Sequence, residues 1–327
     1  MTNELIFRKA ERKQSKIRIS MSGPSGSGKT YSALKLARGL ASDWNKIALI
    51  DTENGRGDLY SDLGEYNIIT LEAPFRPERF IEAIKACEGA GMEVIIIDSI
   101  SHEWEGSGGC LELNELIAQS KFRGNTWSAW SETTPRHQKF IESIIASPCH
   151  IITTMRSKVE TVMTDEKKVK KIGTKDIQRE GFEYEMTVSF NIDRDKHLAL
   201  AGKDNTHLFE SADAFTITEE HGKQIKDWSE SGKKECPTDE QTEEFKGQLK
   251  TLGMTEKKWN EAVKKQTGKE WKEMSIKEAG EWIKKNNVVI EDRARKAEDL
   301  HKAEKILEEE LEKMVDEVTT GEGVSKI

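Results

Sequence analysis

Short apolar runs alternate with longer segments of helical spacing over the first two thirds of the chain. The apolar runs, each of strand length, cover residues 16–22, 46–54, 67–71, 92–100 and 150–158. Apolar side chains instead recur every three or four positions, as in amphipathic helices, over residues 31–40, 78–89 and 126–146. The run MEVIIIDSI at 92–100 is nearly continuous, which is typical of a central parallel strand buried on both faces. This alternation predicts an α/β domain with a mostly parallel sheet flanked by helices.

The pattern changes after the apolar run at 150–158. Residues 157–180 are polar and rich in lysine. Two segments with alternating apolar and polar residues follow at 184–193 and 197–201, separated by the polar turn 194–196. Alternation on both sides of a short turn predicts an antiparallel hairpin that is added late to the sheet.

A shift in composition beyond about residue 219 predicts a separate C-terminal region. We divide the chain into an α/β domain at 1–220, a linker at 221–237, a small helical domain at 238–288 and a charged helical tail at 289–327. Thr238 and Gln241 fit a capping box at the start of the helical domain. Its expected core consists of apolar and aromatic residues: Phe245, Leu249, Trp259, Trp271 and Trp282.

Composition and charge narrow the range of functions. The chain has 327 residues and a net charge of −8, so any contact with nucleic acid requires a local basic patch. It has four cysteines without a C-x-x-C pair, no leader-like apolar run and no apolar stretch of transmembrane length. We therefore expect a reduced, soluble, cytoplasmic protein without a membrane partner. Cys149 beside His150 invites a nucleophile or ligand interpretation, but a buried cysteine next to a strand-end histidine fits the pattern better.

Residues 23–30 read GPSGSGKT, which is a complete G-x-x-x-x-G-K-[ST] phosphate loop. The motif lies between a predicted strand and a predicted helix, where glycine turns the chain and the free N–H groups of the helix start face an anion. This context predicts that the chain binds a nucleoside triphosphate. The expected contacts come from the loop and the residue after it: Gly23, Pro24, Ser25, Gly26, Ser27, Gly28, Lys29, Thr30 and Tyr31.

Acidic residues at two other strand ends extend this site. Asp98 closes the run VIIID, as a Walker B acid does, close to the Mg²⁺ ion that Thr30 and the phosphates would hold. A general base must also lie within hydrogen-bond reach of the attacking water. In many AAA-type ATPases this base directly follows the Walker B acid, but here that residue is Ser99. The acids available at a neighbouring strand end are Asp51 and Glu53.

These motifs, in this order, resemble the RecA family of recombinases. The shared pattern is GPSGSGKT, then IDTE at 50–53, then IIDS at 96–99, and the likeness covers roughly residues 16–209. It implies a RecA-like α/β core that hydrolyses ATP with Mg²⁺ and assembles as a homo-oligomer, in a ring or a filament. By the same resemblance, Glu53 is the catalytic base, Lys29 binds the β- and γ-phosphates, and Thr30 and Asp98 hold the metal.

Later parts of the chain resemble the family in pattern only. Thr154 lies at the sensor position, where the family usually has glutamine, and Gln178 is an alternative sensor. Lys203 matches a lysine that reaches the ATP of a neighbouring subunit in relatives, although a second basic residue of some relatives is missing. Compact ATPases of this outline occur in bacteriophages near recombination genes, and residues 237–259 resemble the small helical modules of such proteins. The resemblance thus implies DNA recombination in a bacterial host.

A lysine-rich segment follows the sensor strand, where the RecA family has a DNA-binding loop. The lysines that this resemblance assigns to single-stranded DNA are Lys158, Lys167, Lys168, Lys170, Lys171 and Lys175. Acidic residues such as Glu160 and Asp165 are interspersed among them, and a solvated surface hairpin is the alternative. A second candidate for DNA contact is the segment 104–130 with Trp127 and Trp130, although tryptophans at such positions more often pack between helices.

Two functions are consistent with these observations. The first is a DNA-dependent, Mg²⁺-requiring ATPase that oligomerises on single-stranded DNA in recombination or repair. The second is an ATP-switched oligomeric scaffold that recruits a protein partner through its C-terminal helices, without direct DNA contact. The acidic net charge and the charged tail favour the second, and Leu307 and Leu311 keep heptad spacing there while Glu304 interrupts it. No base-reading motif separates ATP from GTP.

Overall fold

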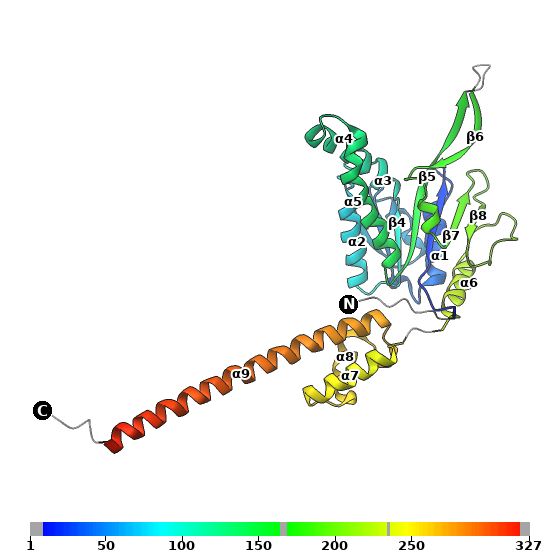
Figure 1. The fold of residues 1–327 in the computed structure, drawn as a ribbon. Helices are drawn as coiled ribbons and strands as arrows, with labels where there is room; N and C mark the ends of the chain where they lie inside the picture. The colour runs from blue at the N-terminus through cyan, green and yellow to red at the C-terminus, as the bar shows by residue number, and fades with distance from the viewer. Residues whose placement is uncertain (1–8, 164–168, 234–235, 321–327) are drawn as a thin grey trace. The chain divides into compact units, whose positions relative to one another are not determined.

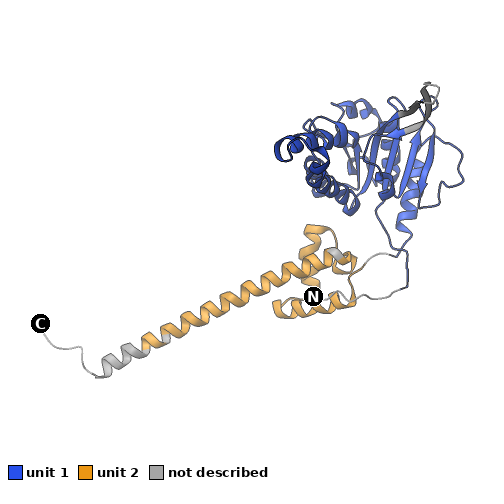
Figure 2. Cartoon of the chain, turned by 45° about the horizontal axis from the view of Figure 1, so that its top comes forward, with its two compact units in different colours: residues 1–233 blue, residues 234–327 orange. Residues whose placement is uncertain are grey.

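The computed structural model describes residues 9–163, 169–233 and 236–320. The chain divides into two compact units, Met1–Lys233 and Lys234–Ile327, which Figure 2 shows in different colours. Each unit has a hydrophobic core of its own.

An eight-stranded mixed sheet forms the centre of the first unit (Figure 1). Seven strands follow the order β3-β2-β4-β5-β1-β7-β8, and β6 pairs with β5 outside this path. The first six of these run parallel to their neighbours, whereas β8 is antiparallel to β7. The strands are β1 Arg18–Gly23, β2 Ile47–Asp51, β3 Asn67–Thr70, β4 Val94–Asp98, β5 His150–Met163, β6 Val169–Asp176, β7 Val188–Ile192 and β8 Ala199–Asp204. The predicted α/β fold, with a mostly parallel sheet and a late antiparallel hairpin, is confirmed.

Helices cover both faces of the sheet because the central strands are apolar on both sides. One face carries α1 (Lys29–Leu40) and α6 (Glu219–Glu230), and the other carries α2 (Pro77–Gly89) and α5 (Thr126–Ala146). Neighbouring residues of β4 show the division, since Ile96 belongs to the core under α1 and Ile97 to the core under α5. Two shorter helices, α3 (Ser101–Glu105) and α4 (Cys110–Lys121), follow β4.

The strand order gathers several loops at one edge of the sheet. Strands β2, β4, β5 and β1 are consecutive neighbours and run parallel, so their carboxyl ends lie along the same edge. The phosphate loop leaves β1 there, Glu53 follows β2, and Asp98 ends β4. Open α/β sheets bind their ligands at this edge.

The described residues of the lysine-rich segment form a β-hairpin, which was the alternative to a DNA-binding loop. β5 continues to Met163, and β6 returns antiparallel to it with Lys158 opposite Lys175. The β-branched residues of the sequence VETVM favour a strand, and pairing with β6 overrides the polar composition. Of the lysines predicted to bind DNA, Lys167 and Lys168 lie outside the described residues, and only the backbone is described at Lys170 and Lys171.

Helix α6 occupies most of the segment that was predicted as a linker at 221–237, so the ordered domain extends further than expected. It packs very closely on α1 through two glycines. A Cβ added to Gly39 would lie 2.0 Å from the carbonyl oxygen of Glu219, and one added to Gly222 would lie 2.2 Å from that of Leu36. The two helices meet mainly through their backbones, and Ile225 is fully buried beside this contact. Few apolar side chains are needed, so the sequence of α6 shows only a narrow apolar stripe.

The second unit is helical. It comprises α7 (Asp239–Leu252), α8 (Glu256–Thr267), the short 3₁₀ turn η4 (Trp271–Glu273) and α9 (Ile276–Thr320). The predicted capping box is confirmed, since Thr238 and Gln241 bond each other's backbone N–H. Phe245 and Trp271 stack with ring centroids 3.9 Å apart in the core, and of the five predicted core residues Trp282 is only partly buried.

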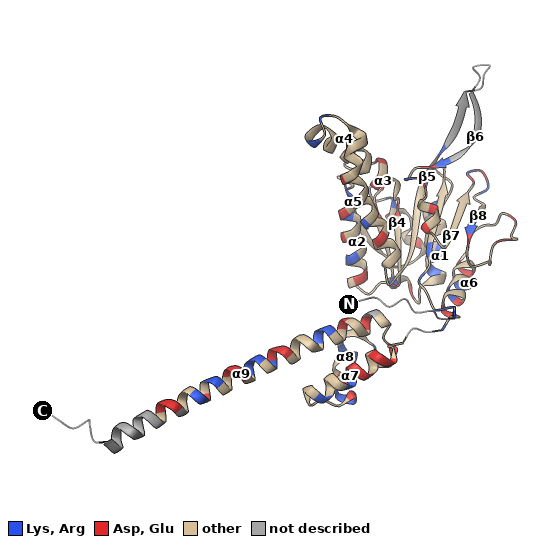
Figure 3. Ribbon diagram, in the orientation of Figure 1, with Lys and Arg blue, Asp and Glu red and all other residues tan. Residues whose placement is uncertain are grey.

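Helix α9 continues without interruption past the predicted boundary at residue 288. Acidic and basic side chains alternate along it, as Figure 3 shows. Alternating charges of both signs are typical of a long helix whose surface faces water rather than a hydrophobic core. Among the described residues, no helix is long and apolar enough to cross a membrane.

Candidate active site

The phosphate loop joins the end of β1 to the start of α1. Gly26 and Gly28 have φ values of 81° and 85°, which side chains with a Cβ rarely adopt. Gly28 caps α1 without a side-chain hydrogen bond, so the first N–H groups of the helix are available to an anion. Within the described residues, the buried Ser27 Oγ has no hydrogen-bond partner. These features fit a bound phosphate.

Lys29 lies over the same loop. Its Nζ donates to the carbonyl oxygens of Gly23 and Pro24 at 2.9 Å each. Burial lowers the pKa of Lys29, and the charges of Asp98 and Glu53 oppose that shift. Phosphate oxygens would offer charged acceptors in place of these two neutral carbonyls, and charge-assisted hydrogen bonds are stronger.

Asp98 at the end of β4 is held by two hydroxyl groups. Thr30 Oγ1 donates to its Oδ2 at 2.5 Å, and Thr154 Oγ1 donates to its Oδ1. Burial raises the pKa of Asp98, and both hydrogen bonds counteract the rise. A threonine hydroxyl and a carboxylate are oxygen ligands of the kind that Mg²⁺ prefers, so Thr30 and Asp98 fit this ion.

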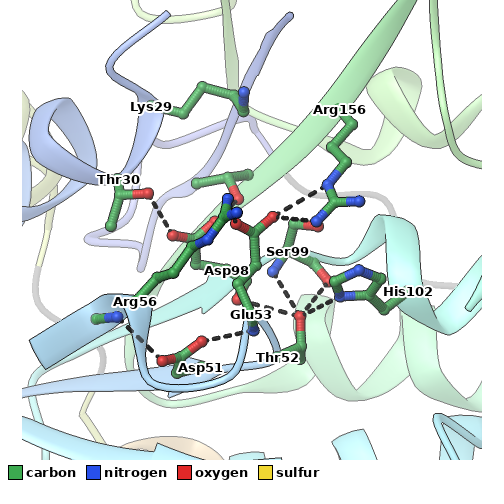
Figure 4. Close-up of polar contacts among 12 residues, drawn as sticks. Lys29, Thr30, Asp51, Thr52, Glu53, Arg56, Asp98, Ser99, His102 and Arg156 are labelled. Carbon is green, nitrogen blue, oxygen red and sulfur yellow. Dashed lines mark hydrogen bonds and ion pairs between the residues drawn. The ribbon is translucent and has the colours of Figure 1, made fainter. Parts of the chain in front are cut away.

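Glu53 lies beside Asp98 and between two arginines (Figure 4). Arg156 donates to Glu53 Oε1 from Nε at 3.0 Å and from Nη2 at 2.7 Å, and Arg56 Nη1 donates to Oε2 at 3.0 Å. Burial alone raises the pKa of Glu53, but the hydrogen bond and charge of Arg156, together with the charge of Arg56, outweigh burial and lower it. Glu53 is therefore ionised at neutral pH, with both oxygens engaged.

The two residues before Glu53 fix the turn that presents it. Asp51 is buried and accepts hydrogen bonds from the N–H groups of Glu53 at 2.6 Å and Gly57 at 3.0 Å. Thr52 Oγ1 accepts from the Ser99 N–H at 2.8 Å and thereby ties the end of β2 to the end of β4. Of the two acids that the sequence offered at this strand end, Asp51 therefore serves the backbone and Glu53 faces the cavity.

These groups surround one cavity of about 280 Å³. It is lined by Ser25, Gly26, Gly28, Lys29, Thr30, Glu53, Arg56, Leu59, Tyr60, Asp98 and Arg156. Sequence reasoning missed four of them, namely Arg56, Leu59, Tyr60 and Arg156. Arg156 had a detectable signal, because it lies two positions after Thr154 on β5 and side chains alternate along a strand.

Other predicted residues lie beside the cavity or away from it. Tyr31 contacts the lining residue Tyr60, with ring centroids 6.2 Å apart. Lys203 Nζ donates to the Tyr184 carbonyl oxygen at 2.6 Å and lines a different cavity. Gln178 Nε2 donates to the carbonyl oxygen of Ile100 at 3.2 Å and does not line the phosphate-loop cavity.

The neighbours Cys149 and His150 are core residues, as the pattern suggested. Cys149 Sγ donates to the Met92 carbonyl oxygen at 3.0 Å, and burial raises its pKa. His150 Nδ1 accepts from the Ile17 N–H at 3.2 Å, and burial lowers its pKa to about 3. A protonated thiol and a neutral imidazole that each serve the backbone do not form a nucleophilic pair.

Comparison with known proteins adds one finding to this geometry. The family model of an AAA domain matches residues 15–216, which is well over half of the chain and includes every residue that lines the phosphate-loop cavity. No curated protein matches the chain. The match supports a P-loop ATPase domain, although Ser99 occupies the position where many AAA-type ATPases have their base.

Proposed function

The chain belongs to the AAA domain family of P-loop ATPases, and from this premise we propose that it is a DNA-stimulated, Mg²⁺-dependent ATPase of RecA type. The observation that carries the proposal is the position of Glu53. It lines the same cavity as Lys29, Thr30 and Asp98, although it follows a different strand from the Walker B acid. An ionised carboxylate opposite a phosphate-binding loop is placed to activate a water for attack on the terminal phosphate.

The roles of the residues follow from their contacts. Lys29 exchanges the Gly23 and Pro24 carbonyls for oxygens of the β- and γ-phosphates. Thr30 and Asp98 would hold Mg²⁺, which would neutralise phosphate charge there. Glu53 accepts the proton of the attacking water.

Arg56 and Arg156 couple the binding of ATP to the freeing of Glu53, the general base. Both guanidinium groups now bond Glu53, and both line the cavity that would receive the triphosphate. The γ-phosphate carries more charge than a carboxylate and competes for the same donors. We propose that ATP draws these arginines away from Glu53, which frees its oxygens for water and places positive charge on the phosphoryl group.

The DNA-binding part of the proposal is supported by the hairpin that continues from the site. β5 carries Arg156 and then Lys158, which pairs with Lys175 of β6, and both lysines are exposed. Single-stranded DNA bound to this basic hairpin would therefore lie close to Glu53, the catalytic group. We further propose that the protein acts in phage DNA recombination as a ring or filament in which Lys203 reaches the ATP of a neighbouring subunit.

The test is the ATPase rate with and without single-stranded DNA at two salt concentrations. The proposal predicts strong stimulation that weakens at higher salt, because phosphate contacts release counterions. A rate that ignores DNA at both salt concentrations contradicts the DNA-dependent function.

An ATP-switched scaffold remains the second candidate because of α9. This helix exposes aliphatic residues, with Leu300 at 64%, Ile306 at 58% and Leu307 at 60% exposure. Such residues on a solvated helix suit a partner helix. This candidate predicts ATP-dependent assembly measured by light scattering, together with a turnover that DNA does not change.

A further inference from the structure

Three tryptophans line a second cavity, separate in its lining residues from the phosphate-loop cavity. Its volume is about 490 Å³, within the range of ligand-binding clefts. Trp104 of α3 and Trp127 and Trp130 of α5 form one side, and Lys175, Arg179 and Glu180 contribute the charged groups. We call this cavity the tryptophan cleft.

Two of the tryptophans form a fixed platform. The rings of Trp104 and Trp130 stack with centroids 5.6 Å apart and an interplanar angle of 19°. His137 packs edge-on against Trp104 at 5.4 Å, and its Nδ1 lies 3.0 Å from the buried Glu103 carboxylate. Since His137 and Glu103 are themselves buried, the platform does not need a ligand to hold its shape.

The third tryptophan has no such support. Trp127 lies in the first turn of α5 and is 86% exposed, the highest exposure among the large hydrophobic residues described. An indole left in water next to two stacked indoles is an unusual surface feature, because large aromatic side chains are normally well buried. It offers a free π-face to a planar ligand.

Positive charge accompanies these aromatic faces. The Arg179 guanidinium lies 6.0 Å from the centre of the Trp130 ring. Lys175 is exposed, lines the cleft from β6 and forms an ion pair with Glu180, which also lines it. Proteins that bind single-stranded nucleic acid usually combine aromatic side chains, on which bases stack, with cationic side chains that contact phosphates.

The cleft is also connected to the basic hairpin of β5 and β6 and to Glu53. Lys175 pairs with Lys158 across the hairpin, and Ile177 N–H donates to the Arg156 carbonyl oxygen at 2.8 Å. The Arg156 N–H in turn donates to Ser101 Oγ at 3.0 Å, at the start of the helix that carries Trp104. Arg156, which holds Glu53, is therefore hydrogen-bonded through its backbone to both segments that contribute residues to the cleft.

We propose that the tryptophan cleft binds an unstacked base of single-stranded DNA, which stacks between Trp127 and the Trp104–Trp130 platform while Lys175 and Arg179 contact the adjacent phosphates. This inference rests on the proposed DNA-dependent function and adds a site for the base to it. The continuity of the cleft with the basic hairpin favours a nucleic acid strand over a peptide or a small aromatic molecule.

The experiment compares full-length wild-type protein with Trp127→Ala and Trp127→Phe. Affinity for a fluorescent oligo-dT and for the same oligonucleotide with abasic sites is measured by anisotropy in the presence of ATP and Mg²⁺. We expect Trp127→Ala to bind oligo-dT about tenfold more weakly, since one stacked base contributes on that scale. Trp127→Phe keeps most of the affinity, and wild type binds the abasic strand about as weakly as Trp127→Ala binds oligo-dT. Leu116→Ala, which removes an exposed apolar side chain of α4 outside the cleft lining, is the matched control and binds normally.

The outcomes separate this inference from the function on which it rests. If wild type binds no oligonucleotide and its ATPase ignores DNA, the DNA function itself fails. If wild type binds DNA but neither Trp127→Ala nor the abasic strand reduces affinity, only the base site is refuted. A change in the mass of Trp127→Ala by light scattering, with DNA affinity intact, would assign the cleft to a subunit contact instead. Tighter binding of oligo-U than of oligo-dT would assign the cleft to RNA.

Discussion

The phosphate-loop cavity and the tryptophan cleft belong to the same domain but are built on different principles. In the first, nearly every polar group is bonded to another, as Lys29 is to two carbonyls and Glu53 is to two arginines. In the second, the platform is fixed while Trp127 is left exposed. A closed network of hydrogen bonds must exchange partners when its substrate enters, whereas an open stacking surface only has to be covered.

This difference predicts that variants of the two regions affect different measurements. Changes in the phosphate-loop cavity should alter nucleotide binding and turnover and leave DNA affinity intact under saturating nucleotide. Changes in the tryptophan cleft should do the reverse. The Arg156 side chain serves the cavity, while its backbone N–H bonds Ser101 at the start of the helix that carries Trp104.

The largest expected effect on nucleotide binding is that of Lys29→Ala. Loss of the charged hydrogen bonds to phosphate is expected to weaken ATP binding by about a hundredfold, on the scale of charge-assisted bonds. Isothermal titration with ATP and Mg²⁺ measures this. Lys35→Ala, on the same helix but paired with Glu219 in the structure, is the control that should bind normally. Normal affinity in Lys29→Ala would refute the phosphate role.

A smaller effect is expected for Arg156→Ala. Turnover should fall by about tenfold, because loss of charge at the phosphoryl group outweighs the release of Glu53. The pH profile of kcat/KM, which reports the nucleotide-free protein, is the sharper readout. Arg156 holds the pKa of Glu53 below its ordinary value in that state, so its removal raises this pKa and moves the acidic limb of kcat/KM to higher pH. Arg156→Lys keeps a charge without the two-pronged contact and should be intermediate. An acidic limb that does not shift would show that Glu53 is not the group whose ionisation limits hydrolysis at low pH.

The same ion pair makes a prediction about stability. A carboxylate whose pKa is lowered in the folded chain stabilises the fold above its unfolded value, which is about 4.5, and this contribution is lost as pH falls through the folded pKa. Wild type should therefore lose its stability advantage over Arg156→Ala below about pH 4.5. Thermal unfolding of both proteins between pH 3 and pH 7 tests this, and a difference in melting temperature that does not change with pH argues against the pair.

The smallest effect on nucleotide chemistry is expected for Trp127→Ala. Its side chain does not line the phosphate-loop cavity, so ATP affinity and turnover without DNA should stay within about twofold of wild type. DNA-stimulated turnover at limiting DNA should fall with DNA affinity. A large loss of basal turnover would mean that the two regions are not separate.

The phosphate-loop cavity was largely predictable from sequence because its chemistry is local. GPSGSGKT is one continuous stretch, and the strand before it and the helix after it show their own periodicity. Asp98 and Glu53 could be added because each directly follows an apolar strand, and parallel strands end at a common edge. Arg156 was missed because its partner Glu53 lies about a hundred residues away and meets it only through the strand order.

Where the structure differs from expectation, tertiary contact outweighs local composition. For the lysine-rich segment after Lys158 the sequence left a loop and a hairpin open, and β6 supplies the hydrogen-bond partner of the hairpin. Helix α6 looked like a linker because Gly39 and Gly222 replace the usual apolar contact with α1 by close backbone packing. Trp104 and Trp130 do pack between two helices, as is usual for tryptophans at such positions, but the sequence does not show which helices meet.

The central claim is that Glu53 activates the attacking water, and Glu53→Gln tests it most directly. Glutamine keeps the size of the side chain but cannot accept a proton at neutral pH. We expect ATP affinity by titration to stay near normal while single-turnover hydrolysis at saturating ATP and DNA falls by about a hundredfold or more. Glu72→Gln, an exposed residue after β3, is the control and should hydrolyse ATP normally. Near-normal hydrolysis by Glu53→Gln would contradict the account.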